Sequence, residues 1–438
     1  MLVVGLGRFG GGVGVTRWLV SQGATVTVTD QATRGELAES VAAIADLPVT
    51  LHLGGHDEGD LDTTDLVIIN PAVHKSASAF FQAVERRGIP WTTEMNLFCV
   101  RCPAPVLGVT GSYGKSTTCT MLAEALEACL RAGEASYTGV HLGGNIGCSL
   151  LNELPNIRES DCVVLEMSNA QLEDLPQIQW APDIAVVANL FPHHLDRYSS
   201  FADYARAKLN ITRHPAGTSR IVVGELHREA EELLREIVAG GRGRLVRVPS
   251  PHPAIDLKVP GDHNQRNAAC VLTVSRILGL NETVVRGALG DFRGLPHRLE
   301  FVGTLGGVEF CNDSKSTAPA ATIVALEALR RPAVAIVGGQ RKDVALAECA
   351  NFLARYCRVV ICMGASGPDF SDALRAGSAA SQALKIHVVA TLADAVLLAR
   401  TEAAPGEVVL FSPGAPSFDQ YANFTERGRH FAELVQGL

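Results

Sequence analysis

The amino-acid sequence predicts an α/β protein of about three domains. Short β-branched runs such as LVVGLG, APVLGVTG, CVVLEMS, PAVAIVGG and EVVLFSPG alternate with glycine-rich turns and helical patterns along the whole chain. Such alternation is typical of parallel sheets covered by helices on both faces. The length of 438 residues exceeds what one hydrophobic core sustains and corresponds to about three domains of roughly 150 residues.

Two breaks divide this alternation. The first is FCVRCPAP at residues 98–105, where two prolines separate an opening α/β unit from the next one. The second is GDFRGLPHR at residues 290–298, after which a new series of strands begins with VEFCNDSKST. We therefore expect domains at residues 1–98, 99–293 and 294–438.

Composition narrows the class of protein. Hydrophobic residues make up 47% of the chain and the net charge is -8, which argues against a general nucleic-acid binder because phosphate binding needs a basic face. No apolar run reaches the ~20 residues that span a bilayer. The chain opens on MLVVGLG, a strand and turn rather than a secretion signal; the abrupt opening leads us to expect that a few residues of the first strand are missing.

Eleven cysteines lie mostly in segments with apolar neighbours, as expected of small core residues in a reducing compartment. We therefore expect a cytoplasmic protein. No pattern in the sequence specifies an oligomer, and we expect a monomer.

The first strand is followed by a glycine turn. Gly5, Gly7 and Gly10 form G-x-G-x-x-G, and Asp30 ends the next strand at TVTVTD. This pattern fits a dinucleotide cofactor such as NAD or FAD, whose pyrophosphate lies at a helix N-terminus. It fits equally a tight turn in any α/β unit, or the diphosphate of a UDP-linked substrate. The motif by itself does not distinguish among these three interpretations.

A second glycine turn, in GVTGSYGKSTTCTML at residues 108–122, predicts a phosphate-binding loop. A strict G-x-x-x-x-G-K-[ST] motif would need glycine at Val109, so the loop is a shorter form with Gly111 and Gly114. Backbone N–H groups and the helix N-terminus would face the phosphates, Lys115 would reach the β- and γ-phosphates, and the Ser116 hydroxyl would suit Mg²⁺. The alternative is a capped helix start after a glycine turn. Strand before and helix after favour a nucleotide site, with the candidate residues Gly111, Ser112, Gly114, Lys115, Ser116 and Thr117.

Magnesium needs further hard oxygen ligands beyond the loop hydroxyl, and two strand ends place polar side chains near the loop. Glu166 ends CVVLEMS, and ANLFPHHLDRY places His193 and His194 just after another strand. Each could be a solvated loop residue; together with the phosphate loop they favour a metal or substrate role for Glu166 and His194. By default, Lys208 in YARAKLNI is interpreted as an exposed helix lysine.

These segments occur in the order found in a known family. TGSYGKST, GGNIG, LEMSNAQLE, NLFPHHLDRY, AKLNI, GDHNQRNAA, GLPHRLE, NDSKST and SPGAPSFDQYANFTERG together resemble the Mur ligases of peptidoglycan synthesis over essentially the whole chain. Within that family, the resemblance points to the branch that adds D-glutamate to UDP-N-acetylmuramoyl-L-alanine. It implies a Rossmann-like N-terminal domain for the UDP-sugar (1–98), a central P-loop ATPase domain (99–293) and a Rossmann-like C-terminal domain for the amino acid (294–438).

The resemblance also implies a reaction and its cofactors. The substrate carboxylate would attack the γ-phosphate of ATP, and the D-glutamate amine would displace phosphate from the acyl phosphate. Two Mg²⁺ ions are implied at Ser116, Glu166, His194 and Lys208, with Lys208 converted to a carbamate. Catalytic roles fall on Lys115, Glu166, His194 and Lys208. Further ATP contacts are implied at Asn267, Arg298 and Asp313. Substrate contacts are implied at Gly7, Asp30, Asn145, Lys315, Thr317, Lys342, Ser417 and Phe424.

The chain departs from the family pattern at several substrate-facing positions. Tyr113 stands where asparagine is usual in the phosphate loop, and NPAVHKS lacks the usual serine and glycine of the first-domain substrate loop. SNAQLE, FPHHLD and SPGAPS also differ. Two alternatives therefore stay open: a related Mur or folylpolyglutamate-type ligase acting on another acid or amino acid, and a nucleotide-binding paralogue without catalysis.

Overall fold

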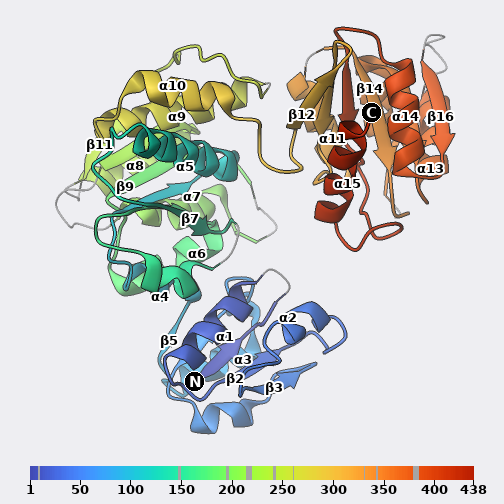
Figure 1. The fold of residues 1–438 in the computed structure, drawn as a ribbon. Coiled ribbons are helices and arrows are strands. Elements are labelled where there is room, and N and C mark those ends of the chain that lie inside the picture. Colours follow the sequence, from blue (N-terminus) through green and yellow to red (C-terminus); the bar gives the residue numbers. More distant parts are fainter. Residues whose placement is uncertain are drawn as a thin grey trace. The chain divides into compact units, whose positions relative to one another are not determined.

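The computed structural model describes residues 1–7, 10–146, 149–193, 197–213, 220–239, 243–259, 261–329, 331–341, 344–377 and 384–438. The chain forms two compact units. The first comprises Met1–Pro253 with Arg266–Ala288, and the second comprises Ala254–Gln265 with Leu289–Leu438. Three sheets are present in the described part of the chain, and all three combine strands with covering helices (Figure 1). The α/β prediction is confirmed.

The N-terminal sheet is parallel, with strand order β3-β2-β1-β4-β5. Its strands are β1 (Leu2–Val4), β2 (Thr27–Asp30), β3 (Thr50–Leu53), β4 (Val67–Ile69) and β5 (Trp91–Thr92). Its helices are α1 (Gly11–Ser21), α2 (Ala38–Ala42), α3 (Ala79–Arg86) and α4 (Glu94–Cys99), with short 3-10 turns η1 (Glu58–Thr63) and η2 (Lys75–Ala77). Alternate residues of β1 face opposite sides: Val3 belongs to the core that includes α1, whereas Leu2 and Val4 pack with Phe80 and Phe81 of α3.

The central sheet is also parallel, with order β11-β10-β9-β6-β8-β7. Its strands are β6 (Val106–Thr110), β7 (Val140–Gly144), β8 (Cys162–Glu166), β9 (Ile184–Leu190), β10 (Arg220–Leu226) and β11 (Arg244–Arg247). Its helices are α5 (Lys115–Arg131), α6 (Asn169–Glu173), α7 (Phe201–Leu209), α8 (Arg228–Ala239), α9 (Asp262–Ile277) and α10 (Glu282–Asp291), with 3-10 turns η3 (Leu150–Asn156), η4 (Leu175–Ile178) and η5 (Asn210–Thr212). Because β6 lies between β8 and β9, the turns that follow these three strands meet at one edge.

The sheet of the second unit has order β12-β13-β17-β14-β15-β16. Its strands are β12 (Glu300–Leu305), β13 (Val308–Asn312), β14 (Ala333–Gly338), β15 (Cys357–Met363), β16 (Lys385–Val389) and β17 (Val408–Phe411), and its helices are α11 (Pro319–Leu329), α12 (Ala347–Tyr356), α13 (Gly367–Gly377), α14 (Leu392–Glu402) and α15 (Phe424–Gln436). One face of β14 packs under α11, α12 and α13, and its other face packs under α14 and α15. This is a three-layer arrangement, visible in Figure 1.

One strand of this sheet runs against the parallel pattern. β12 pairs antiparallel with β13, and Gly306 and Gly307 join them with φ of 58° and 78°. Left-handed backbone at both turn residues matches the twist of a two-residue hairpin and favours glycine. The Gly-Gly pair between two β-rich runs was a usable hairpin signal that the sequence analysis did not exploit.

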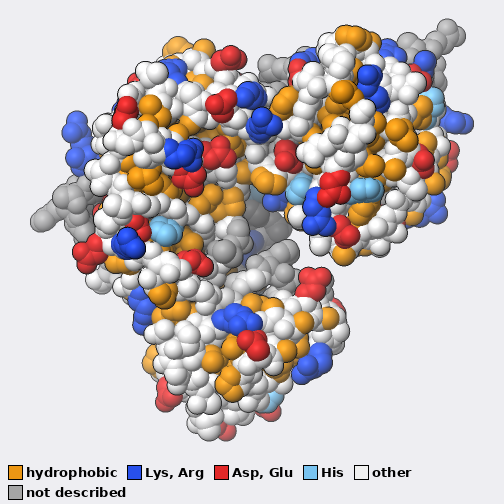
Figure 2. All heavy atoms as spheres, viewed as in Figure 1, with side chains coloured by type: hydrophobic (Ala, Val, Ile, Leu, Met, Phe, Trp, Pro, Cys, Tyr) orange, Lys and Arg blue, Asp and Glu red, His pale blue; other side chains and the backbone are white. Residues whose placement is uncertain are grey.

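Acidic and basic side chains are interspersed on the face shown in Figure 2. In the described part of the chain, no helix combines the length and the apolar character that a membrane crossing requires.

Candidate functional site

The N-terminal glycine turn adopts the backbone that its sequence predicts. Gly5, Gly7 and Gly10 have φ of 93°, 64° and 85°, a region that side chains disfavour. Gly10 precedes α1, whose N-terminus opens towards the turn. Asp30 accepts a hydrogen bond from the Gly7 N–H at 3.0 Å and another from the Ala32 N–H at 2.8 Å. Gly7 and Asp30, which were both predicted to contact the substrate, are thus hydrogen-bonded to each other.

A cavity of about 460 Å³ lies at this turn. Besides Gly7 and Asp30, its walls include Asn70, His56 and His74, which the sequence analysis did not select. Asn70 follows β4, whose neighbour in the sheet is β1, and its side-chain amide donates to Gly5 O at 3.0 Å. β1 and β4 are distant in sequence and become neighbours only in the folded sheet. Folding is therefore what brings Asn70 to the glycine turn.

The phosphate loop connects β6 to α5. Gly114 begins the helix with φ of 72°, and a Cβ there would come within 2.5 Å of Asn267 Oδ1. Asn267 is 3% exposed on α9, so one of the residues implied to contact ATP lies against the phosphate loop. The Lys115 ammonium donates to Gly111 O at 3.0 Å and to Ser112 O at 3.3 Å. Lys115 and Ser116 are half-buried, and Thr117 is buried.

The loop is held by contacts that the motif does not contain. Asn189, at the end of β9, accepts from the Tyr113 N–H and donates to Tyr113 O, both at 2.9 Å. Ser112 Oγ donates to Phe191 O and accepts from the Phe191 N–H, both at 2.9 Å. Tyr204 of α7 adds a hydrogen bond to Ser112 Oγ at 3.1 Å. The Tyr113 ring itself is 53% exposed and lies edge-on to His193.

Glu166 ends β8 and is 1% exposed. Asn145 donates two hydrogen bonds to Glu166. The Asn145 backbone N–H donates to Glu166 O at 2.9 Å, and the Asn145 side-chain amide donates to Glu166 Oε1 at 2.8 Å. The other carboxylate oxygen, Oε2, is buried and has no hydrogen-bond partner among the described atoms. A buried carboxylate oxygen without a donor is costly, and a hard cation would satisfy it.

Lys208 is not an exposed helix lysine. It is 1% exposed on the buried face of α7, with its ammonium 3.3 Å from Thr110 Oγ1 and 5.3 Å from the Tyr204 ring centroid. Burial, reinforced by the positive charge of Lys115 and opposed by Glu166, lowers the pKa of Lys208 well below its usual range. The default interpretation of Lys208 was wrong because helix periodicity does not reveal which face packs against β6.

These residues offer a donor set that fits magnesium. Ser116 supplies a hydroxyl and Glu166 an unsatisfied carboxylate oxygen, and both are oxygen ligands of the kind Mg²⁺ prefers. Within the described ranges no group of three or more His, Cys, Asp or Glu is placed to hold a metal ion. His194, the remaining predicted ligand, lies outside the described residues, as does Lys342.

In the second unit, Asp313 is 4% exposed just after β13. Its carboxylate accepts hydrogen bonds from the Ser412 hydroxyl at 2.7 Å, from the Leu299 N–H at 3.1 Å and from the Ser316 hydroxyl. Burial nevertheless raises the pKa of Asp313 to about 6. Arg298 is exposed on the preceding turn.

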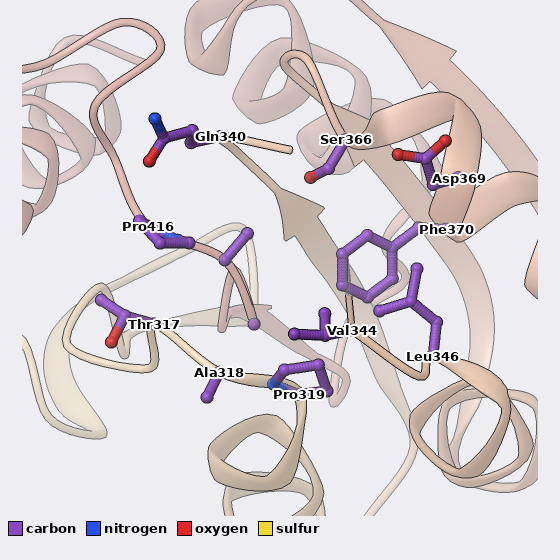
Figure 3. Close-up of a pocket in the computed structure, with 12 residues that line it drawn as sticks. Thr317, Ala318, Pro319, Gln340, Val344, Leu346, Ser366, Asp369, Phe370 and Pro416 are labelled. Carbon is purple, nitrogen blue, oxygen red and sulfur yellow. The ribbon is translucent and has the colours of Figure 1, made fainter. Parts of the chain in front are cut away.

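The residues predicted to surround the amino-acid substrate lie near the same end of this sheet as Asp313. Lys315 is exposed, with its ammonium 5.8 Å from the Phe424 ring centroid, and Ser417 is 1% exposed. Thr317 lies at the edge of a cavity of about 90 Å³, into which Val344 and Phe370 point (Figure 3). Gln340, Ser366 and Asp369 add polar groups to its wall, and the sequence analysis had not selected them.

Arg427 is another residue that the sequence analysis missed. It is fully buried and donates to Ser314 Oγ at 3.0 Å, Ser314 O at 2.8 Å and Ala415 O at 3.0 Å. Arg427 thus ties the segment before Lys315 to the segment before Ser417. A single buried arginine in FTERG gives no sequence signal of that role.

Three family models match the chain. Residues 1–92 match the model described as "Mur ligase MurD-like, N-terminal domain", residues 109–238 match "Mur ligase middle domain", and residues 297–414 match "Mur ligase, glutamate ligase domain".

Curated relatives match over the full length. A UDP-N-acetylmuramoylalanine–D-glutamate ligase of Symbiobacterium thermophilum is 37% identical, with 100% of this chain and 97% of the relative covered. An enzyme of the same name from Roseiflexus sp. is 33% identical, with 100% and 98% covered.

Solved structures share the fold at low identity. The UDP-N-acetylmuramate–alanine ligase MurC of Thermotoga maritima matches with a TM-score of 0.58 at 21% identity, covering 100% of this chain and 99% of that one. MurF of Acinetobacter baumannii matches with a TM-score of 0.58 at 17% identity, covering 99% and 93%.

Proposed function

The chain belongs to the Mur ligase family, and from that premise we propose that it joins D-glutamate to UDP-N-acetylmuramoyl-L-alanine at the expense of ATP. The observation that carries this proposal is the group formed by the phosphate loop, the unsatisfied Glu166 carboxylate and the buried amine of Lys208. Full-length similarity to ligases of that name supports the choice of substrates.

The reaction couples two displacements. The carboxylate of the L-alanyl group attacks the γ-phosphorus of ATP, and ADP leaves. The D-glutamate amine then attacks the acyl carbon, gives up a proton, and phosphate departs through a tetrahedral intermediate. Activation is needed because hydroxide is a poor leaving group in water, whereas phosphate is a good one. Most of the rate enhancement in such chemistry comes from positioning and charge stabilisation.

The residues of the first unit would serve ATP. Backbone N–H groups of Gly111–Thr117 at the start of α5 would receive the phosphates, and Lys115 would exchange its bonds to Gly111 O and Ser112 O for the β- and γ-oxygens. Asn267, which lies beside Gly114, is proposed for the adenine. Arg298 and Asp313 are proposed for the phosphate and the ribose.

Two magnesium ions would be held by Ser116, Glu166, His194 and the carbamate of Lys208. When bound, Mg²⁺ neutralises phosphate charge. The protein contributes the environment for the carbamate: burial lowers the pKa of Lys208, which favours the neutral amine, and a neutral amine adds to CO₂ with loss of a proton. The product is an anionic oxygen donor where a cation would otherwise be buried.

The proposed substrate residues fall into two groups. Gly7, Asp30 and Asn145 would serve the UDP-sugar and its peptide, and the cavity of about 460 Å³ at the N-terminal glycine turn supports a diphosphate there. Lys315, Thr317, Lys342, Ser417 and Phe424 would surround D-glutamate, whose two carboxylates suit two lysines. We further propose the three domains 1–98, 99–293 and 294–438, a monomeric state and a cytoplasmic location.

Phosphate release with a panel of amino acids tests the function. With UDP-N-acetylmuramoyl-L-alanine, ATP and Mg²⁺, D-glutamate should give the fastest turnover, with L-glutamate, L-lysine and diaminopimelate far slower. Lys115→Ala should abolish turnover, while Lys385→Ala, at an exposed lysine paired with Glu402, should not. Equal turnover with L-lysine or diaminopimelate would contradict the substrate assignment.

A further inference from the structure

The loop that lines the N-terminal cavity also carries residues that do not line it. Asn70, Ala72, Val73, His74 and Ala77 all contribute to the cavity wall. Lys75, in the middle of this loop, instead lines a neighbouring hollow with Trp91 and Asp174. The segment 70–77 contains NPAVHKS, whose departure from the family pattern the proposed function leaves unexplained.

Lys75 forms an ion pair with a residue 99 positions away in sequence. Its ammonium lies 2.8 Å from Asp174 Oδ2, and the two side chains are only 16% and 4% exposed. The ammonium also lies 5.7 Å from the Trp91 ring centroid. Exposed pairs contribute little because water and salt screen them, whereas removing one partner of a buried pair leaves an uncompensated charge. Lys75 is therefore a strong attachment point for the loop.

A further hydrogen bond holds the backbone of Asp174. Its carbonyl accepts a hydrogen bond from the Asn96 amide at 2.9 Å, and Asn96 is completely buried. Burial raises the pKa of Asp174 and the adjacent Lys75 charge opposes that rise, as expected when an ionised carboxylate depends on its partner.

A second contact holds the other end of the loop. Arg197 donates to Pro71 O at 3.5 Å and pairs with Glu173 at 3.3 Å. Glu173 also accepts from Tyr198, whose hydroxyl receives the Asn169 amide at 2.8 Å. Arg197 thus connects Pro71 to Glu173. At the other end of the loop, Lys75 pairs directly with the adjacent residue, Asp174.

The attachment points lie close in sequence to the proposed metal ligands. Glu173 and Asp174 end the short helix α6, which follows Glu166 at the end of β8. We propose that Lys75 is a positioning residue: its ion pair with Asp174, assisted by Arg197, holds the sugar-nucleotide loop in one register relative to the strand that carries Glu166. This inference rests on the proposed function for its consequence in catalysis.

The consequence follows from how a tethered substrate reaches ATP. A UDP-sugar held by the 70–77 loop must present its distant carboxylate at the phosphate loop, and a displacement of about 1 Å can cost as much as 100-fold in rate. A loop of small residues without such contacts would allow the distance between the substrate carboxylate and the phosphate loop to vary. The largely buried ion pair between Lys75 and Asp174 restricts that variation.

Kinetic constants of matched variants test the proposal. Lys75→Met keeps the length of the side chain and removes the charge; we expect kcat to fall about tenfold because the bound carboxylate is misplaced, and the KM for UDP-N-acetylmuramoyl-L-alanine to rise about tenfold, with the KM values for ATP and D-glutamate within about twofold. Lys75→Arg should restore most of the loss. The control is Lys258→Met, because Lys258 and Asp291 are also 2.8 Å apart but are 43% and 83% exposed; it should match the wild type.

A double variant separates positioning from simple stabilisation. Lys75→Met/Asp174→Asn removes both charges, so it should recover most of the thermal stability lost in Lys75→Met while keeping the raised KM. Recovery of KM together with stability would overturn the proposal, as would an unchanged KM in Lys75→Met.

Hydrogen–deuterium exchange supplies a readout that needs no turnover. Amide exchange across residues 70–78 should accelerate in Lys75→Met and not in Lys258→Met. Unchanged exchange overturns the attachment even in an active enzyme. If the wild type shows no turnover with the proposed substrates, the proposed function fails, and the exchange result still decides whether Lys75 fixes the loop.

Discussion

At the scale of single residues, burial determines the chemistry of this protein more than residue type does. Lys208 and Asp313 are an ordinary lysine and aspartate in the sequence, yet both lie more than nine-tenths buried in the fold. Removing water penalises the charged form of each group. A lysine with a lowered pKa becomes a nucleophile, and an aspartate with a raised pKa becomes sensitive to mild acid.

Lys208 should carry a carbamate in the active enzyme. We expect Lys208→Ala to lower turnover by at least about 100-fold, and added acetate to restore part of it by placing a carboxylate in the space vacated by the side chain. Mass spectrometry of the native protein should show the added mass of one CO₂. Normal turnover in Lys208→Ala would exclude a catalytic carbamate.

Asp313 should make stability depend on pH in a specific direction. Its pKa in the folded state, about 6, lies above the ordinary 3.8, so the folded protein binds this proton more tightly than the unfolded chain. The stabilisation is complete below pH ~4 and is lost as pH rises through ~6, a change of about 3 kcal/mol. Asp313→Asn should lack this loss in calorimetry, so its melting temperature relative to wild type should increase between pH 4 and pH 7.

The control for this experiment is Asp291→Asn, at a carboxylate that is 83% exposed and paired with Lys258. It should retain the wild-type trend between pH 4 and pH 7. A parallel trend in Asp313→Asn and wild type would show that Asp313 is not the responsible group.

At the scale of elements, strand adjacency brings together the residues of the proposed ATP site. The turn after β6 carries the phosphate loop, β8 delivers Glu166 and β9 delivers Asn189, and these three strands are neighbours in the sheet. The two hydrogen bonds from Asn189 to the Tyr113 backbone hold the loop in shape before nucleotide arrives. Such preorganisation reduces the entropy lost on binding.

Asn189→Ala should therefore weaken ATP binding without unfolding the protein. We expect the KM for ATP to rise by up to about thirtyfold, in line with two lost hydrogen bonds of ~1 kcal/mol each, and the KM for D-glutamate to change little. Asn281→Ala is a matched control because that side chain also bonds a backbone N–H, that of Thr283, at an exposed helix start. An unchanged KM for ATP would show that the loop keeps its shape without Asn189.

At the scale of the whole molecule, the two glycine turns proposed to bind nucleotides lie on different sheets, β1 in one and β6 in the other. Each turn combines left-handed glycines with a helix start, and each is held by a polar side chain from a neighbouring strand, Asn70 or Asn189. Two such turns allow a sugar nucleotide and ATP to be bound at once. A ligase that joins a nucleotide-linked acid to an amine needs that capacity.

Calorimetric titration should reveal two independent nucleotide sites. Asp30→Ala removes the acceptor for the Gly7 and Ala32 N–H groups, so UDP affinity should fall more than about tenfold while ADP–Mg²⁺ affinity is retained. Lys115→Ala should show the opposite pattern. Loss of both affinities in either variant would contradict separate sites.

Part of this organisation was predictable because it is encoded locally. The β-branched runs, the glycines at positive φ and the lysine after Gly114 are properties of short segments, and they were sufficient for the α/β fold and both turns. Strands β3, β5, β7, β11 and β12 were not predicted. Their residues are partly exposed, so they lack the continuous apolar run that marks a buried strand.

The sequence by itself determined the α/β class, the two glycine turns and, through its motifs, the family and the candidate site. Only the tertiary structure decided that Lys208 is buried, that Asn189 holds the phosphate loop and that Lys75 pairs with Asp174. The physical reason is range. Backbone conformation and hydrophobic periodicity depend on neighbours within a few residues, whereas burial and ion pairing depend on groups that approach only when distant strands and helices pack.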